Sequence, residues 1–212
     1  MIAKDVHSLS LATSTALSDY YVPNFIPPLE VIHVLNDAGV RFLLVGAHGL
    51  GGWMRKPRTT QDVDVLVAAR GHKKAVRALL AAFPDLEAEE DDVVTRLVEP
   101  TTKTVRIDVI KPNQPLFREV IKHRHPVTSE GQTYNIPTVE AALAMKFAPM
   151  ISLNRPEEYR HQDAHDFITI IKANPEIDLR QLAMFGDLVY NNGGKEIVEL
   201  VRKVRAGEKL TI

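Results

Sequence analysis

The apolar and polar positions of residues 27–67 follow two periods, one typical of helices and one typical of strands. PPLEVIHVLNDAG, residues 27–39, begins with two prolines and carries apolar residues at helical spacing, so it predicts a helix that stops at Gly39. The run VRFLLVGA, residues 40–47, is continuously apolar, as in a strand buried on both faces. The run DVDVLV, residues 62–67, alternates instead. It predicts a second strand whose two acidic side chains project from the same face.

The next part of the chain predicts a helix and a hairpin. GHKKAVRALLAAF, residues 71–83, has helical periodicity, and the acidic stretch at residues 85–92 predicts a solvated connection. VVTRLVE, residues 93–99, and TVRIDVI, residues 104–110, predict two strands joined by a tight connection. Residues 111–138 are punctuated by proline and glycine and have little periodicity, so we expect an irregular crossover there.

These elements predict an α/β (α+β) fold in three parts. Residues 1–26 are rich in serine and threonine and weakly periodic, which is typical of a loose N-terminal arm with helical character near its middle. Residues 27–136 predict a core in which helices flank a small mixed β-sheet. Residues 137–212 carry helical stripes and predict a helical C-terminal part.

Composition and charge narrow the class of protein. Lys plus Arg total 26 against 27 Asp plus Glu, a net charge of -1, so total charge indicates no particular partner. The absence of cysteine excludes disulfides, thiolate zinc sites and cysteine nucleophiles, and it fits a reducing cytoplasm. Asp5 and His7 interrupt the apolar region that a signal peptide requires, and no run has the length of a membrane span. We therefore expect a cytoplasmic protein with no membrane partner.

Three acidic residues stand on predicted strands. Asp62 and Asp64 share one face of their strand, and Asp108 lies in the middle of a strand that can be its neighbour. Burying like charges side by side is unfavourable unless a cation compensates them. Carboxylates that converge from adjacent strands make an oxygen-rich site suited to Mg²⁺ or Mn²⁺. We therefore predict a metal site formed by the three acids.

A pair of small residues, Gly46 and Ala47, follows the first predicted strand. Backbone N–H groups at such a position can approach a phosphate without obstruction by side chains. An apolar strand that ends in a small-residue pair, then Asp-x-Asp, then a third acid on a later strand resembles the nucleotidyltransferase superfamily that includes DNA polymerase beta. The resemblance implies that Asp62, Asp64 and Asp108 hold the metals. It also implies that Asp108 helps deprotonate the acceptor hydroxyl.

More narrowly, the chain resembles minimal and toxin-type nucleotidyltransferases, in which Arg-x-Thr-x-Asp-h-Asp is common, where h is an apolar residue. Arg58 and Thr60 match this run ahead of the two acids. Members of the abortive-infection AbiE class carry a lysine after an apolar helical run and then an Asp-x-x-Asp helix. Lys146 and Asp163 match those positions. The resemblance implies that Gly46, Ala47, Arg58, Lys146 and Asp163 bind the nucleotide.

The implied activity is Mg²⁺- or Mn²⁺-dependent transfer of a nucleoside monophosphate from a nucleoside triphosphate to an acceptor hydroxyl. The acceptor can be RNA, a protein or a small molecule, and a cognate antitoxin is a candidate partner under the toxin-type resemblance. Two alternatives remain open at this point. One is a catalytically inactive protein of the same fold that binds nucleotide or a partner, because Ala47 stands where Ser or Gly is usual. The other is a metal-dependent phosphodiesterase or nuclease, because clustered acids also serve hydrolysis.

Overall fold

The computed structural model describes residues 2–210 of the 212, and the side chains of residues 7–210. By its internal packing the chain divides into two compact units, Met1–Pro137 and Thr138–Ile212. None of the helices in the described part of the chain combines the length and the apolar character that crossing a bilayer requires.

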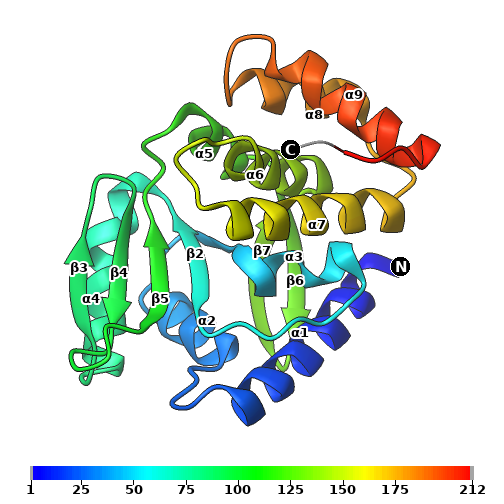
Figure 1. Cartoon of the computed structure of the whole chain (residues 1–212). Coiled ribbons are helices and arrows are strands. Elements are labelled where there is room, and N and C mark those ends of the chain that lie inside the picture. Colours follow the sequence, from blue (N-terminus) through cyan, green and yellow to red (C-terminus); the bar gives the residue numbers. More distant parts are fainter. Residues whose placement is uncertain (1, 211–212) are drawn as a thin grey trace. The chain divides into compact units, whose positions relative to one another are not determined.

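The first unit combines a mixed sheet, a hairpin and several helices (Figure 1). Its elements in chain order are α1 (Ile2–Tyr21), α2 (Pro28–Asp37), β1 (Phe42–Leu44), α3 (Gly46–Met54), β2 (Val63–Val67), the short 3-10 helix η1 (Ala69–Gly71), α4 (His72–Ala82), β3 (Glu87–Glu90), β4 (Val94–Val98), β5 (Val105–Ile110), α5 (Pro115–Val120), β6 (Arg124–Ser129) and β7 (Gln132–Pro137).

The sheet of the first unit has the strand order β1-β2-β5-β4-β3. Strands β2 and β5 pair in parallel, whereas the other neighbours are antiparallel. The parallel pair places Asp64 directly opposite Asp108. The predicted mixed α/β core is therefore confirmed.

One face of this sheet is covered by α2 and α4. Val63, Val65 and Val109 point to that side and form one buried apolar cluster with residues of both helices, including Ile32 and Leu79. Side chains alternate between the two faces of a strand. The residues between the buried valines, Asp64 among them, therefore project from the opposite face of the sheet.

Helix α1 differs from the loose arm that the sequence predicts. It runs from Ile2 to Tyr21, and its buried residues recur three or four positions apart on one face: His7, Ser10, Leu11, Ser14 and Ser18. Most of these residues are polar, so a search for apolar periodicity finds little. The packing partner is α3, and a Cβ atom on Gly52 of α3 would lie only 2.6 Å from the Cβ of His7.

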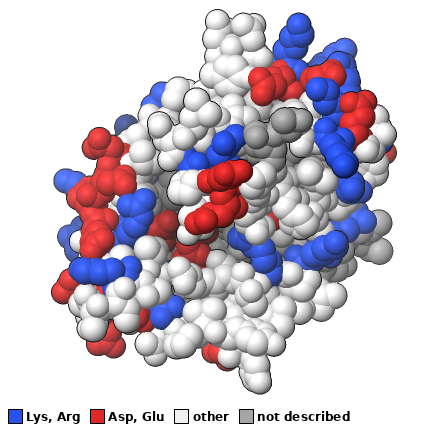
Figure 2. Space-filling view, viewed as in Figure 1, with Lys and Arg blue, Asp and Glu red and all other residues white. Residues whose placement is uncertain are grey.

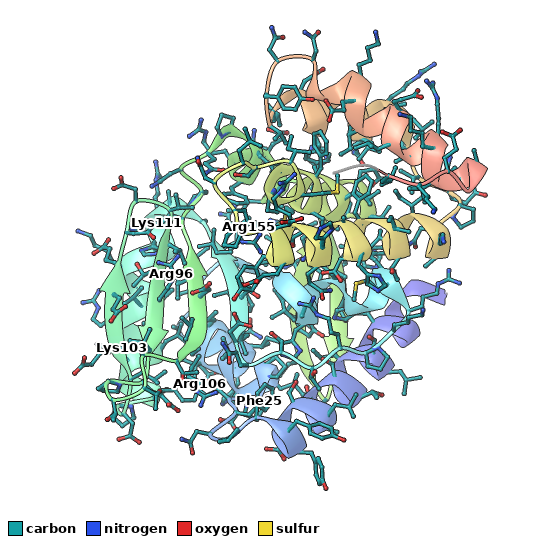
Figure 3. The ribbon with its side chains drawn as sticks, viewed as in Figure 1. Phe25, Arg96, Lys103, Arg106, Lys111 and Arg155 are labelled. Atoms are coloured by element: carbon teal, nitrogen blue, oxygen red, sulfur yellow. The ribbon has the colours of Figure 1, made fainter. Side chains whose placement is uncertain are left out.

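Two further segments differ from the predictions. Residues 87–90, expected in a solvated connection, form the edge strand β3, whose exposed acidic side chains hide the strand pattern. Figure 2 shows acidic side chains gathered there, and they belong to Glu87, Glu89, Glu90 and the two residues that follow. Lys103, in the turn between β4 and β5, pairs with Glu89, and Lys111, directly after β5, pairs with Glu90 (both lysines are labelled in Figure 3). The expected crossover at residues 111–138 contains α5 and the hairpin β6–β7.

The second unit is helical, as predicted. It contains α6 (Val139–Met150), α7 (Glu157–Ala173), α8 (Leu179–Asp187) and α9 (Gly193–Ala206). The Thr138 side chain accepts a hydrogen bond from the backbone of Ala141 and so caps α6. Buried aromatic side chains, among them Phe147, Phe167 and Phe185, fill the core of this unit.

The stability of the first unit depends on keeping two buried histidines neutral. Burial, with the charge of Arg58 second, lowers the pKa of His48 to about 4, and burial lowers the pKa of His7 to about 4. Because these folded pKa values lie below the ordinary value of 6.5, the unfolded chain binds more protons between pH 6.5 and 4. Stability is therefore full above pH 6.5 and falls as the pH drops toward 4, on the order of 3 kcal/mol per histidine.

We expect the variant His48→Gln to lose less stability than the wild type between pH 7 and pH 4.5. Urea unfolding at the two pH values measures the difference. His33→Gln is the matched control, because His33 is an exposed histidine of the same unit that pairs with Asp37. Equal pH slopes for wild type and His48→Gln would contradict this account.

Candidate metal and nucleotide site

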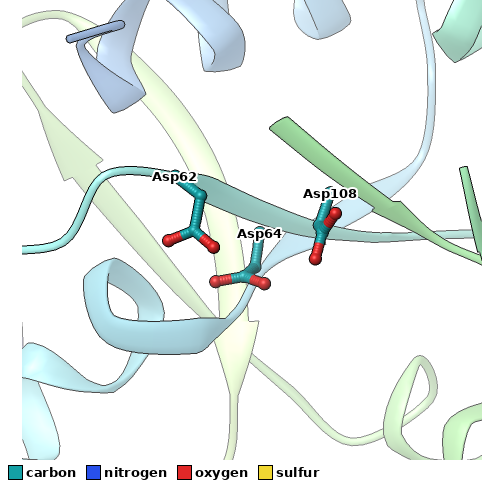
Figure 4. Close-up of side chains that lie close together, drawn as sticks. All are labelled: Asp62, Asp64 and Asp108. Atoms are coloured by element: carbon teal, nitrogen blue, oxygen red, sulfur yellow. The ribbon is translucent and has the colours of Figure 1, made fainter. Parts of the chain in front are cut away.

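Three carboxylates meet on the face of the sheet that α2 and α4 leave uncovered. Asp62 immediately precedes β2, Asp64 lies within β2, and Asp108 lies opposite Asp64 on β5. Their side chains point to the same side (Figure 4), and each offers an oxygen within 4.8 Å of the others. The structure thus brings together the three acids that the sequence singles out.

The electrostatics of the cluster call for a cation. Burial and the neighbouring charge of Asp62 raise the pKa of Asp108 to about 6, although Arg96 acts in the opposite direction. The Asp108 Oδ1 atom is buried and accepts no hydrogen bond within residues 7–210. A buried, unpaired carboxylate oxygen beside two more carboxylates is unfavourable by itself. The donor set, all oxygen and close together, fits a hard divalent cation such as Mg²⁺ or Mn²⁺.

Gly46 lies against the cluster, at the first position of α3. Its φ angle is +58°, and a Cβ atom there would fall 1.7 Å from Asp64 Oδ2. Only glycine tolerates both the left-handed backbone and this close approach. The strand end is joined to the site as well, because the N–H of Val45 donates to the carbonyl oxygen of Asp64 at 2.9 Å.

Helix α3 presents its N-terminal N–H groups next to the acids. The residue before it, Val45, provides no side-chain cap, and the first intrahelical bond is the one from the Gly49 N–H to the Val45 carbonyl. The N–H groups of Gly46 and Ala47 therefore precede the hydrogen-bonded turns. A helix N-terminus of this kind favours an anion such as a phosphate.

Arg58 lies in the loop between α3 and β2. Its charge acts on His48, whose pKa it lowers, and its carbonyl oxygen accepts a hydrogen bond from Ser14 of α1. Two residues further on, the hydroxyl of Thr60 donates to Asp62 Oδ1 at 2.5 Å. This loop therefore orients one of the three acids directly.

Lys146 and Asp163 belong to the second unit, where they form a buried ion cluster. Lys146 Nζ lies 2.9 Å from Asp163 Oδ1 and 2.8 Å from Asp166 Oδ2. Arg155 Nε lies 2.7 Å from Asp163 Oδ2 (Arg155 is labelled in Figure 3). Two cations thus meet two carboxylates, which ties α6 to α7.

Arg96 is a site residue that the sequence analysis missed. On β4 it stands directly opposite Asp108, and its guanidinium lies 2.9 Å from Asp91 (Figure 3). Residues opposite each other on neighbouring strands project from the same face. Asp64, Asp108 and Arg96 therefore form one row across three strands. In the sequence Arg96 is a single arginine within a largely apolar strand. Its place beside Asp108 becomes evident only from the strand register.

No family model matches the sequence, and no curated protein matches it. Among solved structures, an antigenic nucleotidyltransferase-like protein from Paracoccidioides brasiliensis is similar, with a TM-score of 0.54 and 18% identity over 96% of this chain and 95% of that one. The chain has a nucleotidyltransferase-like fold. At this identity the likeness shows the fold alone.

Two further solved structures are similar at lower TM-scores. The antibiotic-resistance factor ANT(2'')-Ia has a TM-score of 0.48 and 11% identity over 85% of this chain and 90% of that one. The lincosamide antibiotic adenylyltransferase LnuA has a TM-score of 0.46 and 16% identity over 67% of this chain and 94% of that one.

We expect Gly46→Ala to abolish or strongly weaken metal binding, because the new methyl group would displace the Asp64 carboxylate. Manganese binding followed by electron paramagnetic resonance should weaken by about tenfold or more, the usual effect of disturbing a metal ligand. Gly131→Ala is the matched control. Gly131 also has a positive φ, of +77°, but nothing lies within 4 Å of a Cβ atom placed there. A Gly46→Ala variant with wild-type Mn²⁺ affinity would show that this close contact is not required.

In the second unit, we expect Lys146→Met to destabilise the packing of α6 against α7. The change leaves Asp163 and Asp166 buried with one ammonium fewer, and breaking a buried ion pair in this way costs about 3–5 kcal/mol. Hydrogen exchange of the α6 and α7 amides measures the loss. The control Lys172→Met removes an exposed lysine from the end of α7. Unchanged exchange in Lys146→Met would contradict a structural role for the cluster.

Proposed function

We propose that the chain is a divalent-metal-dependent nucleotidyltransferase. The observation that carries the proposal is that three carboxylates each offer an oxygen within 4.8 Å of the others. Beside them lies Gly46, where any larger side chain would collide with Asp64. The nucleotidyltransferase-like fold is consistent with it. Transfer forms a bond between the acceptor oxygen and the α-phosphorus of a nucleoside triphosphate, breaks the bond to the β-phosphate oxygen, and releases pyrophosphate.

Asp62, Asp64 and Asp108 would hold the metal. When bound, Mg²⁺ or Mn²⁺ neutralises charge on the triphosphate and favours the ionised form of the attacking oxygen. The N–H groups of Gly46 and Ala47 would bind phosphate oxygens at the N-terminus of α3. Asp108, whose Oδ1 has no hydrogen-bond partner in residues 7–210, would accept the proton of the acceptor hydroxyl.

Arg58, Lys146 and Asp163 are the remaining proposed nucleotide-binding residues. Arg58 is supported by its place in the loop that ends at Asp62. Lys146 already contacts two carboxylates, which leaves one of the three N–H donors of its ammonium group for a phosphate oxygen.

Transfer is favoured over the two alternatives by the surroundings of Gly46. A nuclease needs clustered acids and metal but no cradle for a triphosphate, whereas Gly46 and the N-terminus of α3 provide one beside the acids. An inactive protein of the same fold would not need the three carboxylates, and this chain has all three at close range. We propose that the acceptor is RNA, a protein or a small molecule. We also propose a toxin-like role with a cognate antitoxin, and action in the cytoplasm.

The test is a transfer assay with each radiolabelled nucleoside triphosphate, Mg²⁺, and total cell RNA, proteins and metabolites as acceptors. We expect Asp62→Asn and Asp64→Asn to reduce transfer by about 100-fold or more, because each removes a carboxylate charge that would hold the metal. Chelation of the metal should have the same effect. The control Asp85→Asn changes an exposed aspartate of the same unit.

The products separate the proposal from its alternatives. Labelled acceptor with release of pyrophosphate supports transfer. Transfer that persists in both aspartate variants would overturn the assignment of the site, and acceptor-independent release of nucleoside monophosphate would indicate a hydrolase.

A further inference from the structure

The loop between α3 and β2 has little hydrophobic anchorage of its own. It starts at Arg55, which ends α3 in the left-handed conformation with φ 52°, and it leads directly to Asp62. Five of its residues are exposed to solvent: Arg55, Lys56, Pro57, Thr59 and Gln61. Something other than apolar packing must hold its backbone in place, because exposed loops without such contacts are mobile.

Two serine hydroxyls of α1 bind this backbone. Ser14 Oγ donates to the carbonyl oxygen of Arg58 at 2.5 Å, and Ser18 Oγ accepts a hydrogen bond from the N–H of Thr60 at 3.1 Å. The two serines are one helical turn apart, as are neighbours on one face of a helix. Figure 1 shows the loop running along α1.

The second of these contacts adjoins a metal ligand. Thr60, whose N–H is held by Ser18, donates its own hydroxyl to Asp62 Oδ1 at 2.5 Å. A hydrogen bond to a ligating carboxylate fixes its orientation and is part of what determines metal affinity. A continuous path of hydrogen bonds therefore leads from α1 through Thr60 to Asp62.

His48 of α3 also contacts the Ser14 hydroxyl. Its Nδ1 lies 3.4 Å from Ser14 Oγ. Since Ser14 gives its single proton to the Arg58 carbonyl, Nδ1 must carry the hydrogen of the neutral imidazole. Ser14 thus joins α1 both to α3, which carries Gly46, and to the loop that carries Thr60.

Helix α1 is itself held at both ends, so it can serve as a fixed support. Near its start, His7 Nε2 lies 3.2 Å from the Tyr134 hydroxyl of β7. Beyond its end, the carbonyl oxygen of Pro23 accepts a hydrogen bond at 2.6 Å from Arg106, which is labelled in Figure 3 and pairs with Glu99.

We propose that Ser14 and Ser18 are positioning residues of the metal site. They hold the loop so that Thr60 orients the Asp62 carboxylate toward Asp64 and Asp108. The inference rests on the proposed function, since it assigns the serines to the same three-acid site, and it makes α1 a part of that site.

The experiment measures Mn²⁺ affinity of the full chain by electron paramagnetic resonance, with thermal unfolding of every variant. The variants are Thr60→Val, Ser18→Ala, the conservative Ser18→Thr, and the double variants Ser14→Ala/Ser18→Ala and Ser18→Ala/Thr60→Val. The matched control is Ser10→Ala. Ser10 lies buried on the same face of α1, but its hydroxyl has no hydrogen-bond partner in residues 7–210.

We expect Thr60→Val to weaken Mn²⁺ binding by about 10- to 100-fold and the double serine variant by about threefold or more, as for outer partners of metal ligands. Ser18→Thr should restore the affinity that Ser18→Ala loses, and Ser10→Ala should leave it unchanged. Because Ser18 acts through Thr60, the effect of Ser18→Ala should largely disappear in the Thr60→Val background. A purely structural role of Ser18 would lower the melting temperature of Ser18→Ala without a matching loss of Mn²⁺ affinity and would show no such coupling.

The results distinguish this inference from the proposed function. If the wild type binds Mn²⁺ through Asp62 and the serine variants bind it equally well, the positioning role is wrong and the proposed function stands. Equal losses in Ser10→Ala and Ser18→Ala also overturn the positioning role. If the wild type does not bind Mn²⁺, or binds it unchanged in Asp62→Asn, both the inference and the proposed metal site are wrong.

Discussion

The parallel pairing of β2 with β5 is the constraint on which the rest of the site depends. Asp64 and Asp108 are 44 positions apart in the chain, and the register of this pair sets them directly opposite each other. The repulsion between these two carboxylates is offset by the buried valines on the other face, which hold both strands against α2 and α4. Apolar burial on one face thus stabilises an unfavourable charge arrangement on the other. A bound cation would relieve the repulsion between the carboxylates, and this relief would add to the binding free energy of the cation.

Helix α3 connects the acids to the remainder of the first unit, and small residues make this possible. At its first position Gly46 leaves space for the Asp64 carboxylate, and near its end Gly52 lets His7 of α1 approach the backbone of α3 closely. The same short helix therefore adjoins the three acids at one end and packs on α1 over its length. Movement of α1 would reach the site by two routes, through α3 and through the loop that carries Thr60.

Much of the fold could be predicted from the chain because its main elements follow simple periods. The alternation in DVDVLV indicated both the strand and the shared face of its acids, and α2 and the helical C-terminal unit followed from their apolar stripes. The elements that were not predicted lack that signal for physical reasons. Strand β3 lies at the sheet edge with exposed glutamates, and α1 buries serine and histidine in place of aliphatic residues. Hydrophobic patterns reveal elements that bury apolar side chains, and these two elements bury few of them.

For the site, the sequence by itself determined the chemistry: three carboxylates on strands, a small-residue pair after a strand, and no thiol to offer another kind of metal ligand. The alternation along the chain is enough to place Asp62 and Asp64 on the same face, since they are two positions apart. Tertiary structure decided the rest. It brought Asp108 and Arg96 into the same row, joined Lys146 to Asp163, and set the hydroxyls of Ser14 and Ser18 on the loop before Asp62. These contacts join residues 12 to 44 positions apart, and their distances depend on strand order, register and helix packing, which no local pattern of residues encodes.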